Sequence, residues 1–341
     1  MRAEAAASGG SHPAVVLRSL TRRFGSVTAV DALTFEVASG ELFGIVGPDG
    51  AGKTTTLRML AGVLAPTEGD AEIAGTSVAD DPEGVKHGIA YMAQRFGLYE
   101  DLTVQENLDF YADLFRVPRA ERPARLERLY AFSRLGEFRT RLAGDLSGGM
   151  KQKLGLSCAL VHQPRVLLLD EPTFGVDPIS RRDLWLILHQ MVAEGVTVVV
   201  STSYLDEAER CDRVALLHDG RLLALDRPAT LQAELDGRLL SVRSDRPRHA
   251  RDALRRADGT TGAALFGEEV HVVLEEGTEP ADVRRVLADA GVGVLEVEAV
   301  EPSLEDVFIR RVQRIRGAGG GRPDGQDDRD GGAGTGGETH G

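Results

Sequence analysis

Residues 47–54 of this chain read GPDGAGKT and restrict its fold more than any other segment. They fit the pattern G-x-x-x-x-G-K-[ST] of a phosphate-binding loop, which requires a strand before it and a helix after it. The sequence supplies both, because residues 42–46 form a compact apolar run and residues 54–64 have the apolar spacing of a helix. The segment therefore predicts an α/β domain in which a strand, a phosphate-binding loop and a helix follow one another.

Each type of residue in this loop has its own role in binding a nucleotide. Glycines let the backbone curl, so that N–H groups at the helix N-terminus point at the β-phosphate. Lys53 is predicted to reach the β- and γ-phosphates, and Thr54 to ligate Mg²⁺. A glycine-rich turn that binds nothing is the alternative, which the flanking strand and helix disfavour. The predicted ligands are ATP and Mg²⁺, and the predicted ATP-binding residues of the loop are Gly47, Pro48, Asp49, Gly50, Ala51, Gly52, Lys53, Thr54 and Thr55.

A second candidate for phosphate binding lies at residues 146–152, which read LSGGMKQ and begin another predicted helix. Ser147 suits the N-cap position, and Gly148 and Gly149 permit a close approach to the backbone. A γ-phosphate would complete this cap, and Gln152 is included as an ATP-binding candidate. Taken alone, the segment is also consistent with an ordinary capped helix. Together, the two loops suggest that ATP is held from two sides, an arrangement that is usually formed across a dimer.

Two carboxylates follow a predicted buried strand. Residues 166–169 form an apolar run typical of a strand covered on both faces, and Asp170 and Glu171 come directly after it. Asp170 is predicted to hold the Mg²⁺ shell, and Glu171 to orient or deprotonate the attacking water. Two carboxylates after a strand are weak support on their own, because helix N-caps have similar sequences. Their position downstream of a phosphate-binding loop favours the catalytic interpretation.

Two further residues are predicted from their positions. Gln94 follows the apolar residues 88–93, where it could contact Mg²⁺ or the attacking water, although a lone glutamine is normally a surface residue. Phe24 is predicted to stack on the adenine ring, with a core or turn aromatic as the alternative.

Composition argues against several classes of protein. The formal net charge of -13 argues against a nucleic-acid partner, which would require a basic face. Cys158 and Cys211, the only cysteines, are not in a C-x-x-C pair, so a zinc site or a disulfide framework is not expected. No apolar stretch approaches the roughly 18 residues that would span a bilayer. Residues 1–13 lack the basic start and apolar run of a signal peptide, and any membrane part is expected on another chain.

The sequence predicts two folded parts between two flexible ends. Residues 1–13 are expected to be disordered, residues 14–235 to form the nucleotide-binding domain, and residues 317–341 to form a flexible Gly-rich tail. Within the large domain, helices are predicted at 103–116, 119–135, 147–162, 179–193 and 204–210, strands at 166–169 and 196–200, and a hairpin at 214–225. Residues 236–316 are expected to form a small α+β domain, with strands at 239–243, 269–275 and 292–297 and helices at 248–256, 281–290 and 303–312.

The order of these motifs over residues 14–235 resembles that of the ATP-binding cassette (ABC) ATPases. Residues 146–152 are similar to the signature motif of that family, and Asp177 in residues 175–178 (GVDP) is similar to its D-loop aspartate. Residues 204–209 (YLDEAE) and 303–308 (SLEDVF) resemble the ABC-2 exporter subunits of the drug-resistance type. Residues 98–108, 177–185 and 201–209 are especially similar to the first ATPase half of the tandem multidrug exporters of the YbhF type.

The resemblance implies a RecA-like P-loop core with an antiparallel β subdomain and a helical subdomain at about residues 95–162. It implies an ATPase subunit that couples ATP hydrolysis to efflux through an ABC-2 type membrane permease, at the cytoplasmic face of the membrane. The second cassette of the dimer would be a copy of this chain or a paralogue. The alternatives are an ABC ATPase that acts on nucleic acid or ribosomes and a mechanical regulator of a membrane complex. Phe96, Leu98 and Tyr99 are candidates for the permease contact, with core packing as the alternative.

The chain departs from the family pattern at two positions. Ser203 occupies the position where the family usually has a switch histidine, and serine is shorter and has no imidazole. Either the substitution is tolerated and Glu171 still supports hydrolysis, or the site is a slow or asymmetric one whose partner supplies faster hydrolysis. Asp49 stands where the family often has asparagine, and its carboxylate is expected to face away from the nucleotide.

Overall fold

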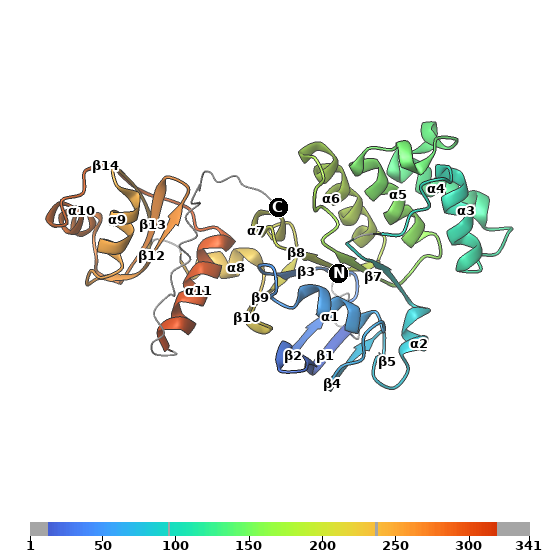
Figure 1. The fold of residues 1–341 in the computed structure, drawn as a ribbon, viewed down its shortest axis with the longest axis horizontal. Coiled ribbons are helices and arrows are strands. Elements are labelled where there is room, and N and C mark those ends of the chain that lie inside the picture. Colours follow the sequence, from blue (N-terminus) through green and yellow to red (C-terminus); the bar gives the residue numbers. More distant parts are fainter. Residues whose placement is uncertain (1–12, 95, 236–237, 319–341) are drawn as a thin grey trace, which may run out of the picture.

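The computed structural model describes residues 13–94, 96–235 and 238–318, and Figure 1 shows their arrangement. The segments predicted to be disordered or flexible, residues 1–13 and 317–341, lie outside the described residues except at their inner ends. Residues 317 and 318 continue the last helix, α11 (Leu304–Ala318). Within the described residues, no helix is long and apolar enough to span a bilayer.

The centre of the structure is a six-stranded sheet with the order β10-β9-β3-β8-β7-β6. The strands from β9 to β6 run parallel, and β10 pairs antiparallel to β9. Their bounds are β3 (Leu42–Val46), β6 (Ile89–Met92), β7 (Val166–Asp170), β8 (Thr197–Thr202), β9 (Arg213–His218) and β10 (Arg221–Asp226). The inner strands are almost continuously apolar because both faces of the sheet are covered.

The two faces of the central sheet belong to different hydrophobic cores. On β7, Leu168 packs into the core that contains α1 (Lys53–Leu60), whereas Leu167 and Leu169 pack into the core that contains α5 (Gly148–Leu160) and α6 (Pro178–Ala193). This alternation follows from the period of two along a strand. The α/β class predicted from the sequence is confirmed.

A second, antiparallel sheet with the order β2-β1-β4-β5 lies beside α1 (Figure 1). It consists of β1 (Val15–Phe24), β2 (Val27–Val37), β4 (Glu68–Ile73) and β5 (Thr76–Ser77), and the short helix α2 (Pro82–Lys86) follows it. The helices α3 (Val104–Leu114) and α4 (Arg122–Ser133) pack with α5 on the opposite face of the central sheet. Thr103 and Glu106 form a capping box that fixes the start of α3.

The C-terminal part is a third sheet with its own core and the order β12-β13-β11-β14. Its strands are β11 (Leu239–Ser244), β12 (Thr260–Phe266), β13 (Glu269–Leu274) and β14 (Val294–Ala299), covered by α9 (Pro247–Leu254) and α10 (Pro280–Asp289). The strand β12 was not predicted, because its sequence TTGAALF contains a glycine and two alanines and gives a weak strand signal.

The helix α11 lies between this sheet and the central sheet (Figure 1). It contacts α7 (Leu205–Ala208), α8 (Pro228–Ala233), β10 and β12. Leu304 and Val307 of α11 are buried in the same core as α5 and α6. The last helix therefore packs against the large domain although it follows the small sheet in sequence.

Replacement of Leu168 by alanine tests the core between the central sheet and α1. Leu168 is fully buried, and Leu168→Ala is expected to lower the free energy of unfolding by about 2–5 kcal/mol, because it removes apolar contacts and leaves a cavity. Urea denaturation measures the change. The control Leu186→Ala changes an exposed side chain of α6 and is expected to cost no more than about 0.5 kcal/mol. Equal losses in the two variants would contradict the assignment of Leu168 to a tightly packed core.

Candidate functional site

The phosphate-binding loop turns directly from β3 into α1, and steric contacts require glycine at two of its positions. A β-carbon on Gly47 would lie 2.3 Å from the Leu217 carbonyl oxygen, and one on Gly52 would lie 2.5 Å from the Ala29 carbonyl oxygen. Gly52 is also the N-cap of α1 and has a left-handed φ of 98°. These glycines bring the loop backbone against β9 and β2, so that the N-terminus of α1 lies at the edge of a cleft that is described below.

Lys53 is only 5% exposed, and its ammonium is surrounded by oxygen atoms. The Nζ atom donates hydrogen bonds to the Gly47 carbonyl at 2.8 Å and the Pro48 carbonyl at 3.1 Å. It also lies 3.1 Å from Oε1 of Glu171, which comes from the end of β7. The predicted phosphate-binding lysine and the predicted catalytic glutamate thus form a buried ion pair.

Asp170 is buried at the end of β7 and accepts hydrogen bonds from three elements. Thr54 Oγ1 and Ser201 Oγ donate to its Oδ1 at 3.0 Å and 2.8 Å. The Tyr91 hydroxyl of β6 donates to Oδ2 at 3.4 Å. Burial, and then the nearby Asp170 charge, raise the pKa of Tyr91, so this hydroxyl remains a donor. Oxygen atoms of Thr54 and Asp170 therefore lie together, as a magnesium site in a phosphate-binding loop requires.

Glu171 has an unusual backbone conformation, with a φ of 47° in the left-handed region. For a residue with a β-carbon this conformation costs about 1–2 kcal/mol, and such strain is concentrated at functional sites. Its N–H donates to the carbonyl and hydroxyl oxygens of Ser201 at 3.2 Å and 3.0 Å. Its Oε2 accepts a hydrogen bond from Nε2 of Gln94 at 3.2 Å. The Glu171 carboxylate is therefore held between Lys53 and Gln94.

A cleft with a volume of 420 Å³ opens over these groups. It is lined by Ala29, Asp49, Gly50, Ala51, Gly52, Lys53, Thr54, Thr55, Gln94, Glu171 and Phe174. The residues fit a nucleotide with Mg²⁺, because the cleft combines a glycine-rich backbone turn, a buried ammonium and the adjacent oxygens of Thr54 and Asp170. Within the described residues, no group of three or more His, Cys, Asp or Glu side chains is placed to hold a metal ion.

Several residues of the site were not predicted from the sequence. Phe174 lines the cleft with an exposed ring, and Ala29 supplies the carbonyl that Gly52 approaches. Ser201 donates to the Asp170 carboxylate and accepts from the Glu171 backbone N–H. A signal for it existed, since it is a polar residue that directly follows a predicted buried strand. Asp49 is exposed and lines the cleft, so the expectation that its carboxylate faces away from the nucleotide stays a prediction.

The second phosphate-binding candidate does not line this cleft. Ser147 caps α5 by accepting a hydrogen bond from the Met150 N–H at 3.3 Å. A β-carbon on Gly148 would contact nothing within 4 Å, whereas one on Gly149 would clash with Ser180 of α6. Ser147 and Gly148 are thus exposed at the start of α5, whereas Gln152 is half-buried and Gly149 is buried. Within one chain, the structure does not bring the two predicted phosphate-binding segments together.

The other predicted residues also lie outside the cleft lining. Phe24 is 46% exposed at the end of β1, directly before the turn to β2, with the Arg22 guanidinium 4.6 Å from its ring centroid. The core alternative is therefore wrong, the turn alternative agrees with this position, and adenine stacking stays a prediction. Asp177 caps α6, and hydrogen bonds from Ser180, followed by that from Ile179, lower the pKa of its carboxyl. Ser203 is partly buried between β8 and α7.

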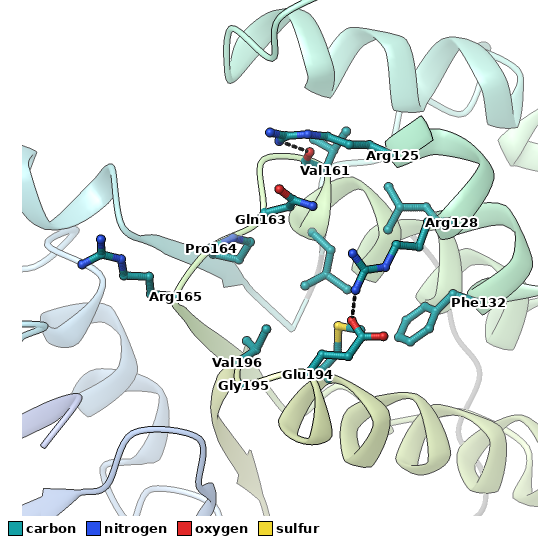
Figure 2. Close-up of a pocket in the computed structure, with 13 residues that line it drawn as sticks. Arg125, Arg128, Phe132, Val161, Gln163, Pro164, Arg165, Glu194, Gly195 and Val196 are labelled. Carbon is teal, nitrogen blue, oxygen red and sulfur yellow. Dashed lines mark hydrogen bonds and ion pairs between the residues drawn. The ribbon is translucent and has the colours of Figure 1, made fainter. Parts of the chain in front are cut away.

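A second cavity of 300 Å³ lies between α4 and the C-terminal ends of α5 and α6 (Figure 2). It borders Arg165 and Val196, which precede β7 and β8, so it lies at the opposite edge of the sheet from the phosphate-binding loop. Arg125 donates to the Val161 carbonyl, and Arg128 pairs with Glu194. This cavity contains none of the predicted site residues.

Comparisons with known families confirm the sequence-based resemblance. Residues 30–174 match the family described as ABC transporter, and residues 227–312 match the family described as ATP-binding protein DrrA1-3-like, C-terminal domain. The second match covers α8, the C-terminal sheet and most of α11.

Individual relatives are similar over most of the chain. It is 44% identical over 300 residues to the probable multidrug ABC transporter ATP-binding protein YbhF of Escherichia coli (strain K12), a match that covers 86% of this chain and 51% of that protein. The chain therefore spans about half the length of this relative. It is 36% identical over 308 residues to the daunorubicin resistance ATP-binding protein DrrA2 of Streptomyces coeruleorubidus, covering 87% of this chain and 94% of that protein.

The fold is also similar to solved ATP-binding cassettes. The dimeric post-hydrolysis structure of the cassette MJ0796 bound to ADP and Pi superposes with a TM-score of 0.57 and 26% sequence identity. The match covers 62% of this chain and 98% of that chain. The cassette fold expected from the sequence is confirmed.

Replacement of Gly52 by alanine tests the geometry of the loop. Because the new β-carbon would meet the Ala29 carbonyl at a backbone φ of 98°, the loop must shift, and we expect the affinity for ATP to fall by about 10-fold or more. Titration with a fluorescent ATP analogue measures the affinity. Gly40→Ala is the matched control, since Gly40 also has a positive φ but its β-carbon would meet no atom within 4 Å. An unchanged affinity in Gly52→Ala would contradict the described loop.

Proposed function

The chain belongs to the family of ABC transporter ATP-binding proteins, and from this premise we propose that it binds and hydrolyses ATP for an ABC-2 type efflux transporter. The observation that carries the proposal is the buried contact between Lys53 and Glu171, with Thr54 and Asp170 beside it. Phosphoryl transfer requires a lysine, a hydroxyl and carboxylates placed around a phosphate-binding loop, and this site has all of them.

The residues of the cleft divide the work of binding and hydrolysis. Backbone N–H groups of the phosphate-binding loop and the Lys53 ammonium bind the phosphates, because the N–H groups at the N-terminus of α1 carry partial positive charge and the ammonium a full one. Thr54, Asp170 and Gln94 are the proposed contacts of Mg²⁺, which neutralises charge on the phosphates when it is bound. Glu171, released from Lys53 when phosphate takes the ammonium, orients the attacking water or accepts its proton.

The second half of the site comes, in this proposal, from another cassette. The start of α5 presents Ser147 and Gly148 away from the cleft, and nothing within 4 Å would contact a β-carbon on Gly148. N–H groups at a helix N-terminus bind phosphate, so the γ-phosphate held by Lys53 of one chain would meet this turn of the other. The dimeric MJ0796 cassette supports a dimer, formed by two copies of this chain or by this chain and a paralogue.

The proposed membrane partner is an ABC-2 type permease, which would hold this chain at the cytoplasmic face of the membrane. Phe96 and Leu98 pack partly buried against the core, whereas Tyr99 and the α3 residue Phe110 expose rings that meet edge to face. Exposed aromatic clusters of this kind are typical of interaction surfaces. The similarity to YbhF and DrrA2 supports drug efflux as the process. The net charge of -13 gives no support to a nucleic-acid partner.

Replacement of Glu171 by glutamine tests the proposed hydrolysis. The amide keeps the shape of the side chain but accepts no proton, so we expect ATP turnover to fall about 10²–10⁴-fold while ATP binding persists. Phosphate release and binding of a fluorescent ATP analogue separate the two properties, and size-exclusion chromatography with ATP and Mg²⁺ shows whether the variant accumulates as a dimer. Native protein that neither binds nor hydrolyses ATP would refute the proposed function.

Replacement of Ser203 by alanine tests whether the hydroxyl at the position of the missing histidine takes part in hydrolysis. If Glu171 is sufficient, Ser203→Ala is expected to change turnover by less than about 10-fold, because Ser203 does not line the cleft and positioning by other groups supplies most of the catalysis. Steady-state phosphate release at saturating ATP is the measurement. A loss as large as that of Glu171→Gln would instead assign a direct role to the Ser203 hydroxyl.

A further inference from the structure

Glu207 of α7 is a buried carboxylate outside the cleft, with only 1% of its surface exposed. Its Oε2 accepts hydrogen bonds from Thr173 Oγ1 at 2.7 Å and Thr202 Oγ1 at 3.2 Å. Its Oε1 lies 3.2 Å from Nε of Arg181. A buried carboxylate is costly unless such partners compensate it, and the loss of one partner is strongly destabilising. The three partners therefore stabilise a carboxylate whose burial would otherwise be unfavourable.

Each partner of Glu207 belongs to a segment of the proposed catalytic site. Thr173 lies two positions after Glu171, and Thr202 directly precedes Ser203. Arg181 is in the first turns of α6, the helix that Asp177 caps, and its guanidinium lies 4.6 Å from the Tyr204 ring centroid. One carboxylate thus joins the loop after β7, the end of β8 and the start of α6.

Glu171 depends on restraints of this kind, because its left-handed backbone persists only where the surroundings fix it. On one side, the Glu171 N–H is bound to Ser201. On the other side, the Glu171 carbonyl accepts from the Phe174 N–H at 3.1 Å, within the turn that Thr173 ties to Glu207. The Thr202 hydroxyl accepts from the Tyr204 N–H at 3.0 Å while it donates to Glu207. Glu207 therefore restrains the segments on which Glu171 and Ser203 lie.

We propose that Glu207 is a positioning residue for ATP hydrolysis, acting through Thr173 and Thr202. The inference rests on the proposed function and adds to it a residue that does not itself line the cleft. Because a displacement of about 1 Å at a reacting group can cost 10²-fold in rate, loosening of these bonds affects turnover. Binding of ATP depends on Lys53 and the loop backbone, and is unaffected.

The test compares four variants of the full chain by steady-state kinetics. Thr173→Val removes the hydroxyl while keeping the shape of the side chain, and Glu207→Gln removes the charge that faces Arg181. Each variant is expected to lower kcat about 10-fold or more, while KM for ATP stays within about 3-fold of the native value. Thr173→Ser restores a hydroxyl donor and is expected to recover most of kcat. Asp206→Asn removes a charge from an exposed side chain of the same helix and is the matched control.

The outcomes separate this inference from the proposed function. A native kcat in folded Thr173→Val, or a rise in KM with kcat unchanged, would overturn the positioning role while leaving ATP hydrolysis intact. Native protein without turnover would overturn both. If Glu207→Gln does not fold, the Thr173 pair decides alone, since valine and serine variants differ chiefly in the hydroxyl and circular dichroism checks that both are folded.

Discussion

The contact between Lys53 and Glu171 sets the geometry around which the site is built. The two residues follow β3 and β7, which are separated in the sheet by β8, and they meet because parallel strands end at the same edge. Ser201, at the end of β8, lies between them and binds both Asp170 and the Glu171 backbone. A lysine and a carboxylate that are both almost buried require each other, because either would be costly alone. In the proposed function, phosphate replaces the carboxylate at the lysine, so the Lys53–Glu171 pair marks the proposed place of the reaction.

Local sequence signals predicted the segments of this site well. The spacing of glycines and Lys53, and the apolar runs of β7 and β8, are properties of contiguous residues, and so are the caps formed by Ser147 and Asp177. Most predicted helices differ from the structure only at their ends: the helix expected at residues 54–64 ends at Leu60, and the one expected at 204–210 spans only Leu205–Ala208. The last helix continues to Ala318 beyond its expected end at residue 312, and the short helices α2 and α8 were not predicted. Terminal turns depend on packing that the sequence pattern does not contain.

Features that depend on contacts between distant segments were not predictable in the same way. No pattern indicated that Glu171 adopts a left-handed backbone, that Gln94 donates to it, or that Glu207 joins three segments. Strand β12 was missed because its stability comes from pairing with β13, and its own residues have a low preference for strands. The adenine contact of Phe24 remains a prediction for a related reason, since stacking on a ligand leaves no trace in a surface aromatic.

The position of α11 affects how this chain can be divided into modules. Leu304 and Val307 complete the core beneath α7, while Gln313 of the same helix donates to the Ala263 carbonyl of β12. By chain order the helix belongs to the appended sheet, and by packing it belongs to the cassette. Consider a hybrid protein in which the cassette of one relative is joined near residue 235 to the C-terminal part of another. The C-terminal part would bring its own α11, and with it the side chains that fill part of the cassette's hydrophobic core. Compatible grafts between relatives need matched side chains on α7, α8 and α11, wherever the junction in the gene is placed.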